Sequence, residues 1–401
     1  MATKTTVNII NSLGPVLKML GLVPEQLEVE KLIQKALDGK LTSSSEQLAI
    51  REALEYLVGS IKSEAALSPV GLMAAHRQIV EGLEAFARVK QARKTHSQIK
   101  EQLIERPVFI TGLPRTGSTI LHSLLAQDPQ IRVPATWEVM RPPIARDDEG
   151  SGIKYCDKRL SLANWLAPEF QSVHPMGARL PQECIAITAY VFRSIVFHTT
   201  MNLPAYENWF EDSDQAPAYR FHREFLQHLQ YFNGGGNWVL KAPGHMFGIG
   251  ALLDEYPDAT IIQTHRDPLK VAPSLASHSK VLRHAFSDAV NDREAASDWL
   301  DRWWQGLDLM LEARSDKESC FYDVFYGDFM QEPLEVIEKL YTRLGWEFSS
   351  EAQNNMAAFL SANPKGKHGK HRYTLQEFDL DANQIRTRLD TYVNRFSLKP
   401  E

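Results

Sequence analysis

A glycine-bounded segment in the first third of the chain combines the residue types that hold a phosphate group. It runs from Gly112 to Thr119 with the letters GLPRTGST, directly after the apolar residues Val108–Ile110. A glycine turn between a strand and a helix points backbone N–H groups and the positive end of the helix dipole at one place, where an anion can bind. Arg115 adds a cation inside the turn. The segment therefore predicts a phosphate-binding loop.

The loop departs from nucleoside triphosphate-binding loops at one position. Gly112 and Gly117 have the spacing of the GxxxxG pattern, but Ser118 stands where that pattern requires a lysine for the β- and γ-phosphates. A loop with an arginine instead suits a single charged phosphate. An ordinary strand-to-helix turn is the alternative, which we disfavour because turn-forming, capping and charged residues coincide here. The candidate ligands are Pro114, Arg115, Thr116, Gly117, Ser118 and Thr119.

A second candidate phosphate contact follows a later apolar run. Arg266 lies in the sequence THRDP, and Ser274 follows it by eight residues. An arginine at the carboxyl end of a parallel strand, with a serine on the next helix, can bind an anion in the crevice where such sheets bind ligands. An Arg-Asp pair that only braces a loop is the alternative. Two separate phosphate sites predict a nucleotide that carries phosphate at two positions.

Four short apolar runs predict the strands that position these residues. Three of them are followed by apolar residues at helical spacing, which is typical of βαβ units on a parallel sheet. The runs are Val108–Ile110, Trp238–Leu240, Ala259–Ile262 and Phe321–Phe325. We therefore expect an α/β fold with three layers, a P-loop-like arrangement and a central parallel sheet.

Helical patterns dominate the rest of the chain. We expect residues 1–105 to form a helical N-terminal region and residues 106–401 to form a second domain. Within that domain, residues 141–236 form a mostly helical insertion rich in aromatic residues. We expect this insertion to build a substrate pocket, and the alternative is that its apolar residues only pack its own helices.

The composition excludes several classes of protein. Lys and Arg number 44 against 50 Asp and Glu, so the net charge is −6, and 43% of the residues are hydrophobic. This balance argues against a disordered or membrane-embedded chain and against extended nucleic-acid binding. Three cysteines without CxxC spacing predict neither a disulfide framework nor a zinc site. No apolar run reaches the ~18 residues of a membrane helix. Together with the cysteine count and the net charge, this leads us to expect a soluble, cytoplasmic protein. We expect neither a metal nor a nucleic-acid partner.

Taken together, the motifs resemble the sulfotransferase family, whose members use adenosine 3′-phosphate 5′-phosphosulfate (PAPS) as donor. Residues 112–119 are similar to the 5′-phosphosulfate loop of its tyrosylprotein and bacterial branches, and Arg266 with Ser274 matches the family's 3′-phosphate element. Tyr326, in the sequence YGDF, resembles the tyrosine-acidic pair that lies near the adenine. The resemblance covers about residues 106–372.

The resemblance implies roles for four residues in sulfuryl transfer. Arg115 and Lys241, which ends the run WVLK, would stabilise the negative charge that grows on the departing 5′-phosphate. Glu138 would be the base that takes the acceptor's proton. We favour it over His245, which resembles the histidine that follows the lysine strand in the cytosolic branch. A buried, hydrogen-bonded side chain is the alternative for either residue, and a strand-end lysine in solvent is the alternative for Lys241.

A late basic segment, residues 363–373, stands out in an otherwise acidic chain. In the family a glycine-containing basic loop folds over the 3′-phosphate, so Lys367 and Lys370 are candidates for that contact. A solvated loop and nucleic-acid binding are the alternatives, and the second is weak because the segment lacks interleaved aromatic residues.

The sequence thus predicts a PAPS-dependent sulfotransferase that modifies a hydroxyl or amine of a small-molecule, lipid or glycan acceptor and releases adenosine 3′,5′-bisphosphate. A P-loop nucleotide kinase or NTPase is the second hypothesis, and Ser118 speaks against it. A non-catalytic nucleotide-binding protein is the third. The sequence does not decide whether the protein forms a homo-oligomer.

Overall fold

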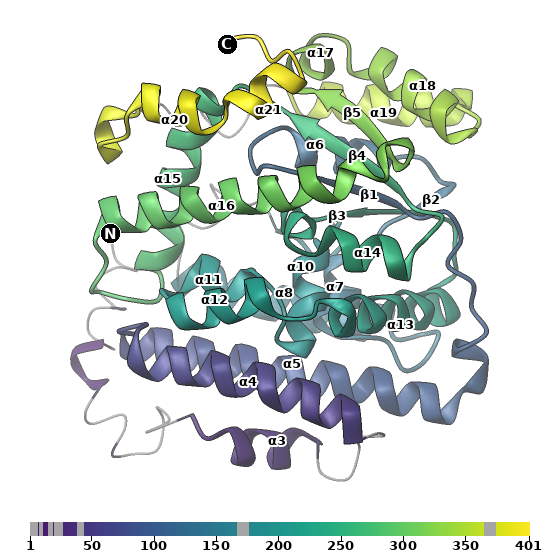
Figure 1. Cartoon of the computed structure of the whole chain (residues 1–401). Helices are drawn as coiled ribbons and strands as arrows, with labels where there is room; N and C mark the ends of the chain where they lie inside the picture. The colour runs from purple at the N-terminus through teal and green to yellow at the C-terminus, as the bar shows by residue number, and fades with distance from the viewer. Residues whose placement is uncertain are drawn as a thin grey trace. The chain divides into compact units, whose positions relative to one another are not determined.

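Two compact units make up the chain. The structure, a computed structural model, describes residues 27–37, 44–166, 176–364 and 374–401, together with residues 7, 11–14 and 19. Unit 1 comprises Met1–Leu103, Pro134–Gly234 and Ser279–Asn291, and unit 2 comprises Ile104–Val133, Gly235–His278 and Asp292–Glu401. Figure 1 labels the helices and strands of each unit. The predicted boundary between residues 105 and 106 stays a prediction.

Unit 2 is built on a five-stranded parallel sheet with the strand order β2-β3-β1-β4-β5. The strands are β1 (Val108–Gly112), β2 (Ile131–Arg132), β3 (Asn237–Lys241), β4 (Thr260–His265) and β5 (Phe321–Phe325). The four apolar runs that predicted strands are confirmed, and so is the α/β fold with a central parallel sheet. The two-residue edge strand β2 carries no apolar run, and the sequence did not reveal it.

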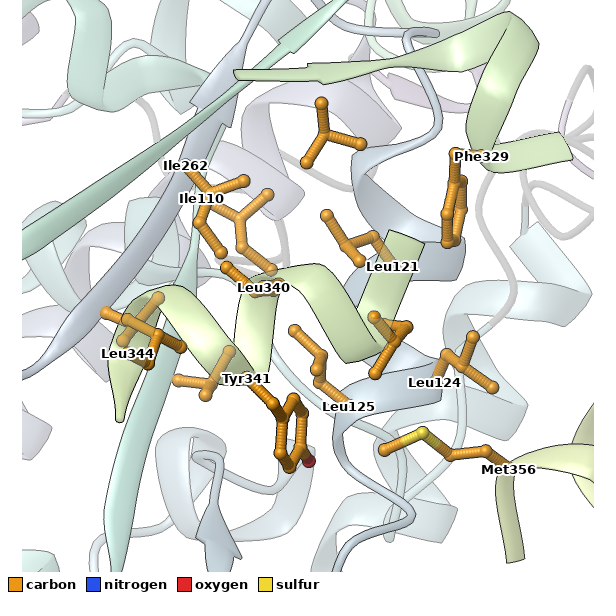
Figure 2. Packing of buried hydrophobic residues seen from close by; sticks show 14 residues of the cluster. Ile110, Leu121, Leu124, Leu125, Ile262, Phe329, Leu340, Tyr341, Leu344 and Met356 are labelled. Atoms are coloured by element: carbon orange, nitrogen blue, oxygen red, sulfur yellow. The ribbon is translucent and has the colours of Figure 1, made fainter. Parts of the chain in front are cut away.

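Helices cover both faces of this sheet. On one face, Val108 and Ile110 of β1 pack into a buried cluster with α6 (Ser118–Leu125), α18 (Pro333–Leu344) and α19 (Ser350–Ala362). Figure 2 shows these side chains gathered together. Successive strand residues point to opposite faces. Phe109 accordingly lies on the other face, with its ring centroid 5.2 Å from that of Tyr256 and 5.2 Å from that of His245. These contacts give the three layers that the sequence predicted.

The connections after the strands carry the remaining helices of unit 2. They are η3 (Pro243–Gly248), α14 (Ile249–Glu255), α15 (Pro268–His284), α16 (Asp292–Ser315), η4 (Glu318–Cys320), α17 (Tyr326–Gln331), η5 (Gln376–Phe378), α20 (Ala382–Arg388) and α21 (Asp390–Arg395). The last residues of α15 belong to unit 1. Because all strands run in parallel, the segments that follow β1, β3, β4 and β5 begin at one edge of the sheet.

Unit 1 is helical. Its elements are α3 (Val29–Leu37), α4 (Ser44–Ser63), α5 (Pro69–Thr95), η1 (Ser97–Ile99), α7 (Thr136–Met140), α8 (Glu149–Leu166), α10 (Cys184–Thr188), η2 (Ala189–Val191), α11 (Val196–Thr200), α12 (Pro204–Asp212) and α13 (Ala216–Asn233). The helical character predicted for both the N-terminal region and the insertion is confirmed. Within the described residues, no helix is long and apolar enough to cross a membrane.

A buried lysine joins the two halves of unit 1. Lys90 of α5 is only 6% exposed, and its ammonium group pairs with Glu46 of α4 and with Glu224 of α13. The ring of Phe86, one turn earlier on α5, packs 5.1 Å from that of Phe221. The N-terminal helices and the insertion helices therefore share one interior, although the chain of unit 2 separates them in sequence.

Candidate active site

The predicted phosphate loop connects β1 to α6 through two glycines in the left-handed region. Gly112 has φ +127° and Gly117 has φ +89°. A Cβ atom at Gly112 would lie 2.6 Å from the carbonyl oxygen of Thr264, and one at Gly117 would lie 3.0 Å from the ring of Tyr326. Both glycines are therefore required by backbone conformation and by space. Arg115, between them, also has a positive φ, at +70°.

Hydroxyl groups beneath the loop fix its shape. The Thr116 hydroxyl donates to the carbonyl oxygen of Leu113 over 2.6 Å and lies 2.6 Å from the hydroxyl of Thr264. Thr264 in turn donates to the carbonyl oxygen of Thr111 over 3.2 Å. Thr116 is buried. Its hydroxyl thus braces the loop against β4, which leaves the first backbone N–H groups of α6 as donors at the loop's mouth.

Lys241 lies at the carboxyl end of β3, beside the start of α6. The lysine is buried, and its Nζ donates to the Thr119 hydroxyl over 3.0 Å. A cation and the N-terminus of a helix therefore converge on the same loop, and both favour an anion there. The predicted phosphate loop and the predicted lysine lie together in unit 2.

The second predicted phosphate element lies against the first. Arg115 donates from Nε to the Ser274 hydroxyl over 3.1 Å, and Arg266 donates from Nη1 to the Arg115 carbonyl oxygen over 3.1 Å. The Arg266 guanidinium also stacks 3.9 Å above the ring of Tyr326. The structure therefore brings four predicted site residues, Arg115, Arg266, Ser274 and Tyr326, into one contact group at the strand ends.

Glu401 completes this group, and the sequence did not reveal it. Its carboxylate lies 3.0 Å from Nη2 of Arg266 and accepts from Nε over 3.1 and 3.2 Å. Its backbone N–H donates to the Asp267 carboxylate over 3.1 Å. A carboxylate is thus held on the guanidinium that the sequence assigned to a phosphate. No local motif marks Glu401, because 134 residues separate it from Asp267 along the chain.

A buried network supports the strand end that carries Arg266. Arg314 of α16 donates from both terminal nitrogens to Asp323 of β5, over 2.6 and 2.8 Å. His265 donates from Nε2 to the same carboxylate over 2.8 Å, and its other ring nitrogen lies 3.0 Å from the Tyr392 hydroxyl. Tyr392 also hydrogen-bonds the backbone of Arg266. The network therefore connects α16, β5, β4 and α21, and through Tyr392 it contacts the backbone of Arg266.

The electrostatics of this network follow from its pairing. Burial opposes the charge on Asp323, but the hydrogen bonds from Arg314 and His265 outweigh it and hold the pKa of the carboxyl well below its ordinary value. Burial lowers the pKa of His265, although its hydrogen bond to Asp323 acts in the other direction. A neutral His265 donates from one nitrogen and accepts from Tyr392 at the other.

The two candidate bases lie in different units. Glu138 belongs to α7 in unit 1 and is buried. One of its carboxylate oxygens accepts from the backbone N–H of Ala135 over 2.8 Å, and the other accepts from Asn233 over 2.5 Å. These two bonds fix the orientation of the carboxylate. His245 lies buried in η3 of unit 2, against Phe109.

The two lysines predicted to contact the 3′-phosphate, Lys367 and Lys370, lie outside the described residues.

Comparison with known proteins agrees with this geometry. A model of the sulfotransferase family matches residues 107–350. The chain belongs to the sulfotransferase family. Its match includes the phosphate loop, both candidate bases, the two arginines and the buried network up to β5.

Two curated mycobacterial proteins resemble the chain in sequence. The ω-hydroxy-β-dihydromenaquinone-9 sulfotransferase Stf3 of Mycobacterium tuberculosis is 27% identical over 270 residues, which cover 61% of this chain and 63% of that protein. The Mycobacterium bovis protein of the same name matches equally. The match thus spans less than two thirds of these relatives' length.

Two crystal structures of mycobacterial sulfotransferases share the fold. STF1 of Mycobacterium tuberculosis has a TM-score of 0.79 and 28% identity, with 91% of this chain and 99% of that one covered. STF9 of Mycobacterium avium has a TM-score of 0.80 over 94% of this chain and 99% of that one, and at 23% identity this likeness concerns the fold alone.

Proposed function

We propose that the protein transfers a sulfuryl group from PAPS to the hydroxyl of an alcohol. The observation that carries this proposal is the convergence of Arg115, Arg266 and Ser274 beside a phosphate loop that lacks the lysine of triphosphate-binding loops. PAPS has anionic groups at both its 5′ and its 3′ position, and the loop and the Arg266 group offer a cation to each. Tyr326, whose ring stacks on Arg266, offers an aromatic face for the adenine.

The transfer is a displacement at sulfur. The acceptor oxygen forms a bond to sulfur while the bond from sulfur to the 5′-phosphate oxygen breaks, and the electron pair of that bond goes to the phosphate. The acceptor's proton goes to the base. The products are a sulfate ester and adenosine 3′,5′-bisphosphate, so atoms and charge balance without an oxidant or a metal.

Negative charge develops on the departing 5′-phosphate during the transfer. Lys241 and Arg115 would stabilise that charge more in the transition state than in the ground state, together with the first N–H groups of α6. A preorganised donor of this kind contributes roughly 10²–10³ in rate. Their positions are fixed in advance, because Lys241 is held by Thr119 and Arg115 by Ser274.

We assign the base to Glu138 and keep His245 as its rival. Glu138 is an oriented carboxylate, because the Ala135 N–H and Asn233 hold both of its oxygens. General-base catalysis contributes roughly 10²–10⁴ in rate. For the acceptor we propose a lipid-like alcohol, since the relatives matched over 61% of this chain are named for a hydroxylated menaquinone.

Calorimetric binding of adenosine 3′,5′-bisphosphate tests the donor. We expect binding that needs no magnesium and that Arg266→Ala weakens roughly 10- to 100-fold, because a charge-assisted hydrogen bond contributes about 1.5–3 kcal/mol. Arg293→Ala is the matched control, since Arg293 is exposed in the same unit and pairs with Asp379. Preference for ATP with magnesium, or an equal loss in both variants, would overturn the proposal.

A further inference from the structure

Arg266 is held by its backbone as well as by its side chain. Its guanidinium contacts the Tyr326 ring, the Arg115 carbonyl oxygen and the Glu401 carboxylate. Its backbone hydrogen-bonds the hydroxyl of Tyr392, which belongs to α21 and is only 2% exposed. The place of the guanidinium therefore depends on a helix near the C-terminus of the chain.

The direction of this backbone hydrogen bond follows from its effect on the phenol. Burial raises the pKa of Tyr392, and the bond with the Arg266 backbone acts in the opposite direction. A partner that lowers the pKa of a phenol donates to its oxygen, because it stabilises the phenolate. The Arg266 N–H is therefore the donor and the Tyr392 oxygen is the acceptor, since a carbonyl group cannot donate.

His265 determines where the hydroxyl proton of Tyr392 lies. Burial lowers the pKa of His265 and so favours the neutral ring. Its Nε2 donates to the Asp323 carboxylate over 2.8 Å, so Nδ1 of the neutral ring is an acceptor. Nδ1 lies 3.0 Å from the Tyr392 oxygen, and the hydroxyl donates to it. Because a hydroxyl has one proton, the oxygen of Tyr392 is left to accept from Arg266.

The charge of Asp323 sets this order. Arg314, which is 2% exposed, donates to Asp323 from both terminal nitrogens over 2.6 and 2.8 Å. A carboxylate accepts and does not donate, so His265 presents an N–H to it. The hydrogen bonds therefore run in one direction, from the Arg266 N–H through Tyr392 and His265 to Asp323.

Aromatic packing holds the two rings of this chain of hydrogen bonds in place. The ring centroid of Phe396, which follows α21, lies 4.1 Å from that of His265 and 5.4 Å from that of Tyr392. Both rings are buried. A phenylalanine in place of Tyr392 would keep these ring contacts and lose only the hydroxyl.

We infer that Tyr392 and His265 are positioning residues for the contact between Arg266 and the 3′-phosphate of the donor. They hold the backbone of Arg266 before the nucleotide binds and act on the nucleotide only through Arg266, so the order is present in advance. The inference rests on the proposed function, which assigns that phosphate to Arg266. It goes further because it gives α21, which lies beyond the segment matched by the family model, a part in donor selection.

Two nucleotides that differ only in the 3′-phosphate test this role. Adenosine 3′,5′-bisphosphate and adenosine 5′-monophosphate are titrated calorimetrically into the wild type and into Tyr392→Phe. We expect the variant to bind the bisphosphate roughly 3- to 10-fold more weakly, the loss of about one hydrogen bond. The monophosphate should bind within about two-fold of the wild type, whereas a merely structural role of Tyr392 would weaken both nucleotides equally.

Tyr341→Phe is the matched control. Tyr341 is another buried tyrosine of unit 2, and its hydroxyl donates to Asp128 over 2.7 Å, at the end of α6 away from the phosphate loop. The control should bind both nucleotides within about two-fold of the wild type. His265→Asn is the second variant, because the shorter side chain cannot contact both Asp323 and Tyr392. It should reduce the preference for the bisphosphate, and it decides if Tyr392→Phe does not fold.

The outcomes separate this inference from the proposed function. A wild type that binds both nucleotides equally has no 3′-phosphate contact, so the proposed function fails and this inference fails with it. If the wild type prefers the bisphosphate and Tyr392→Phe keeps that preference unchanged, only the inference fails. An equal loss for both nucleotides in Tyr392→Phe, or the same loss of preference in Tyr341→Phe, also overturns it.

Discussion

The two units present functional side chains in different ways. Unit 2 presents Lys241, Arg266 and Tyr326 at or just beyond the carboxyl ends of parallel strands, where the sheet fixes their spacing. Unit 1 presents the candidate base Glu138 on the short helix α7, where Asn233 from a distant part of the chain holds it. The hydrogen bonds of the sheet fix the positions of residues at its strand ends. The surface that a helix presents depends more on its individual side chains. We therefore expect substitutions to be tolerated less at the strand ends of unit 2 than on the helices of unit 1.

The largest expected effect is on chemistry in unit 1. Glu138→Gln should lower kcat roughly 10²–10⁴-fold in sulfuryl transfer from PAPS to a lipid-like alcohol, because the amide cannot take a proton. Bisphosphate binding should not change. Glu149→Gln is the control, since Glu149 is exposed in the same unit and pairs with Arg179. If His245→Asn abolishes turnover while Glu138→Gln does not, the base lies in unit 2 and the division of roles between the units breaks down.

The next effect concerns charge stabilisation in unit 2. Lys241→Met should lower kcat roughly 10²–10³-fold, because a cation fixed beside the phosphate loop is lost. The KM for the acceptor should stay near its wild-type value. Lys339→Met, which removes an exposed lysine paired with Glu335, serves as the control. A rise in acceptor KM without a fall in kcat would place Lys241 in acceptor binding instead.

A third prediction concerns stability. Asp323→Asn should lower the free energy of unfolding by about 2 kcal/mol at pH 7, since it removes charge-assisted hydrogen bonds from the buried Arg314, whose remaining carboxylate partner is the more exposed Glu318. Because the pKa of Asp323 is lowered in the fold, its contribution is present above the unfolded value of about 3.9 and is lost as the pH falls further. The difference between variant and wild type should therefore shrink below about pH 4 in denaturant titrations.

The control for this variant is Asp308→Asn, because Asp308 pairs with Arg388 at the surface of the same unit. It should change stability by less than about 1 kcal/mol. A difference between Asp323→Asn and wild type that stays constant from pH 7 to pH 3 would contradict the assigned charge of Asp323.

The smallest effect is expected at Glu401. Its carboxylate competes with a phosphate for Arg266, so Glu401→Gln should tighten bisphosphate binding about two- to five-fold, the range of an exposed ion pair. Glu351→Gln, at an exposed position on α19, should have no such effect. Weaker binding in Glu401→Gln would mean that Glu401 helps to hold Arg266 in place for the nucleotide.

The sequence predicted what depends on local order. The residues from Gly112 to Thr119 are contiguous, and the strands before and after them are short apolar runs, so both loop and sheet could be predicted. The sequence assigned Arg115 and Ser274 to separate phosphate positions. In the structure a hydrogen bond joins these two side chains, which lie 159 residues apart along the chain. Spacing along the chain carries no information about such contacts.

The same limit holds in unit 1, where the sequence leads us to expect a substrate pocket in residues 141–236. That expectation stays a prediction, because a space between helices depends on how they pack and not on their order along the chain. The glutamate on α7 could be singled out only by resemblance, since its partner Asn233 lies 95 residues away.

The ammonium group of Lys90 has a consequence for how unit 1 can be divided. It takes one carboxylate from α4 and one from α13, so deletion of either helix leaves a charge in the interior with half of its compensation. A shortened form that begins after α4 would lose Glu46 and expose the apolar face of α5. The helices α4 and α5, before the phosphate loop, and the helix α13, after it, therefore depend on each other for stability. Proteolytic removal of α4 should destabilise the packing of α13 against α5.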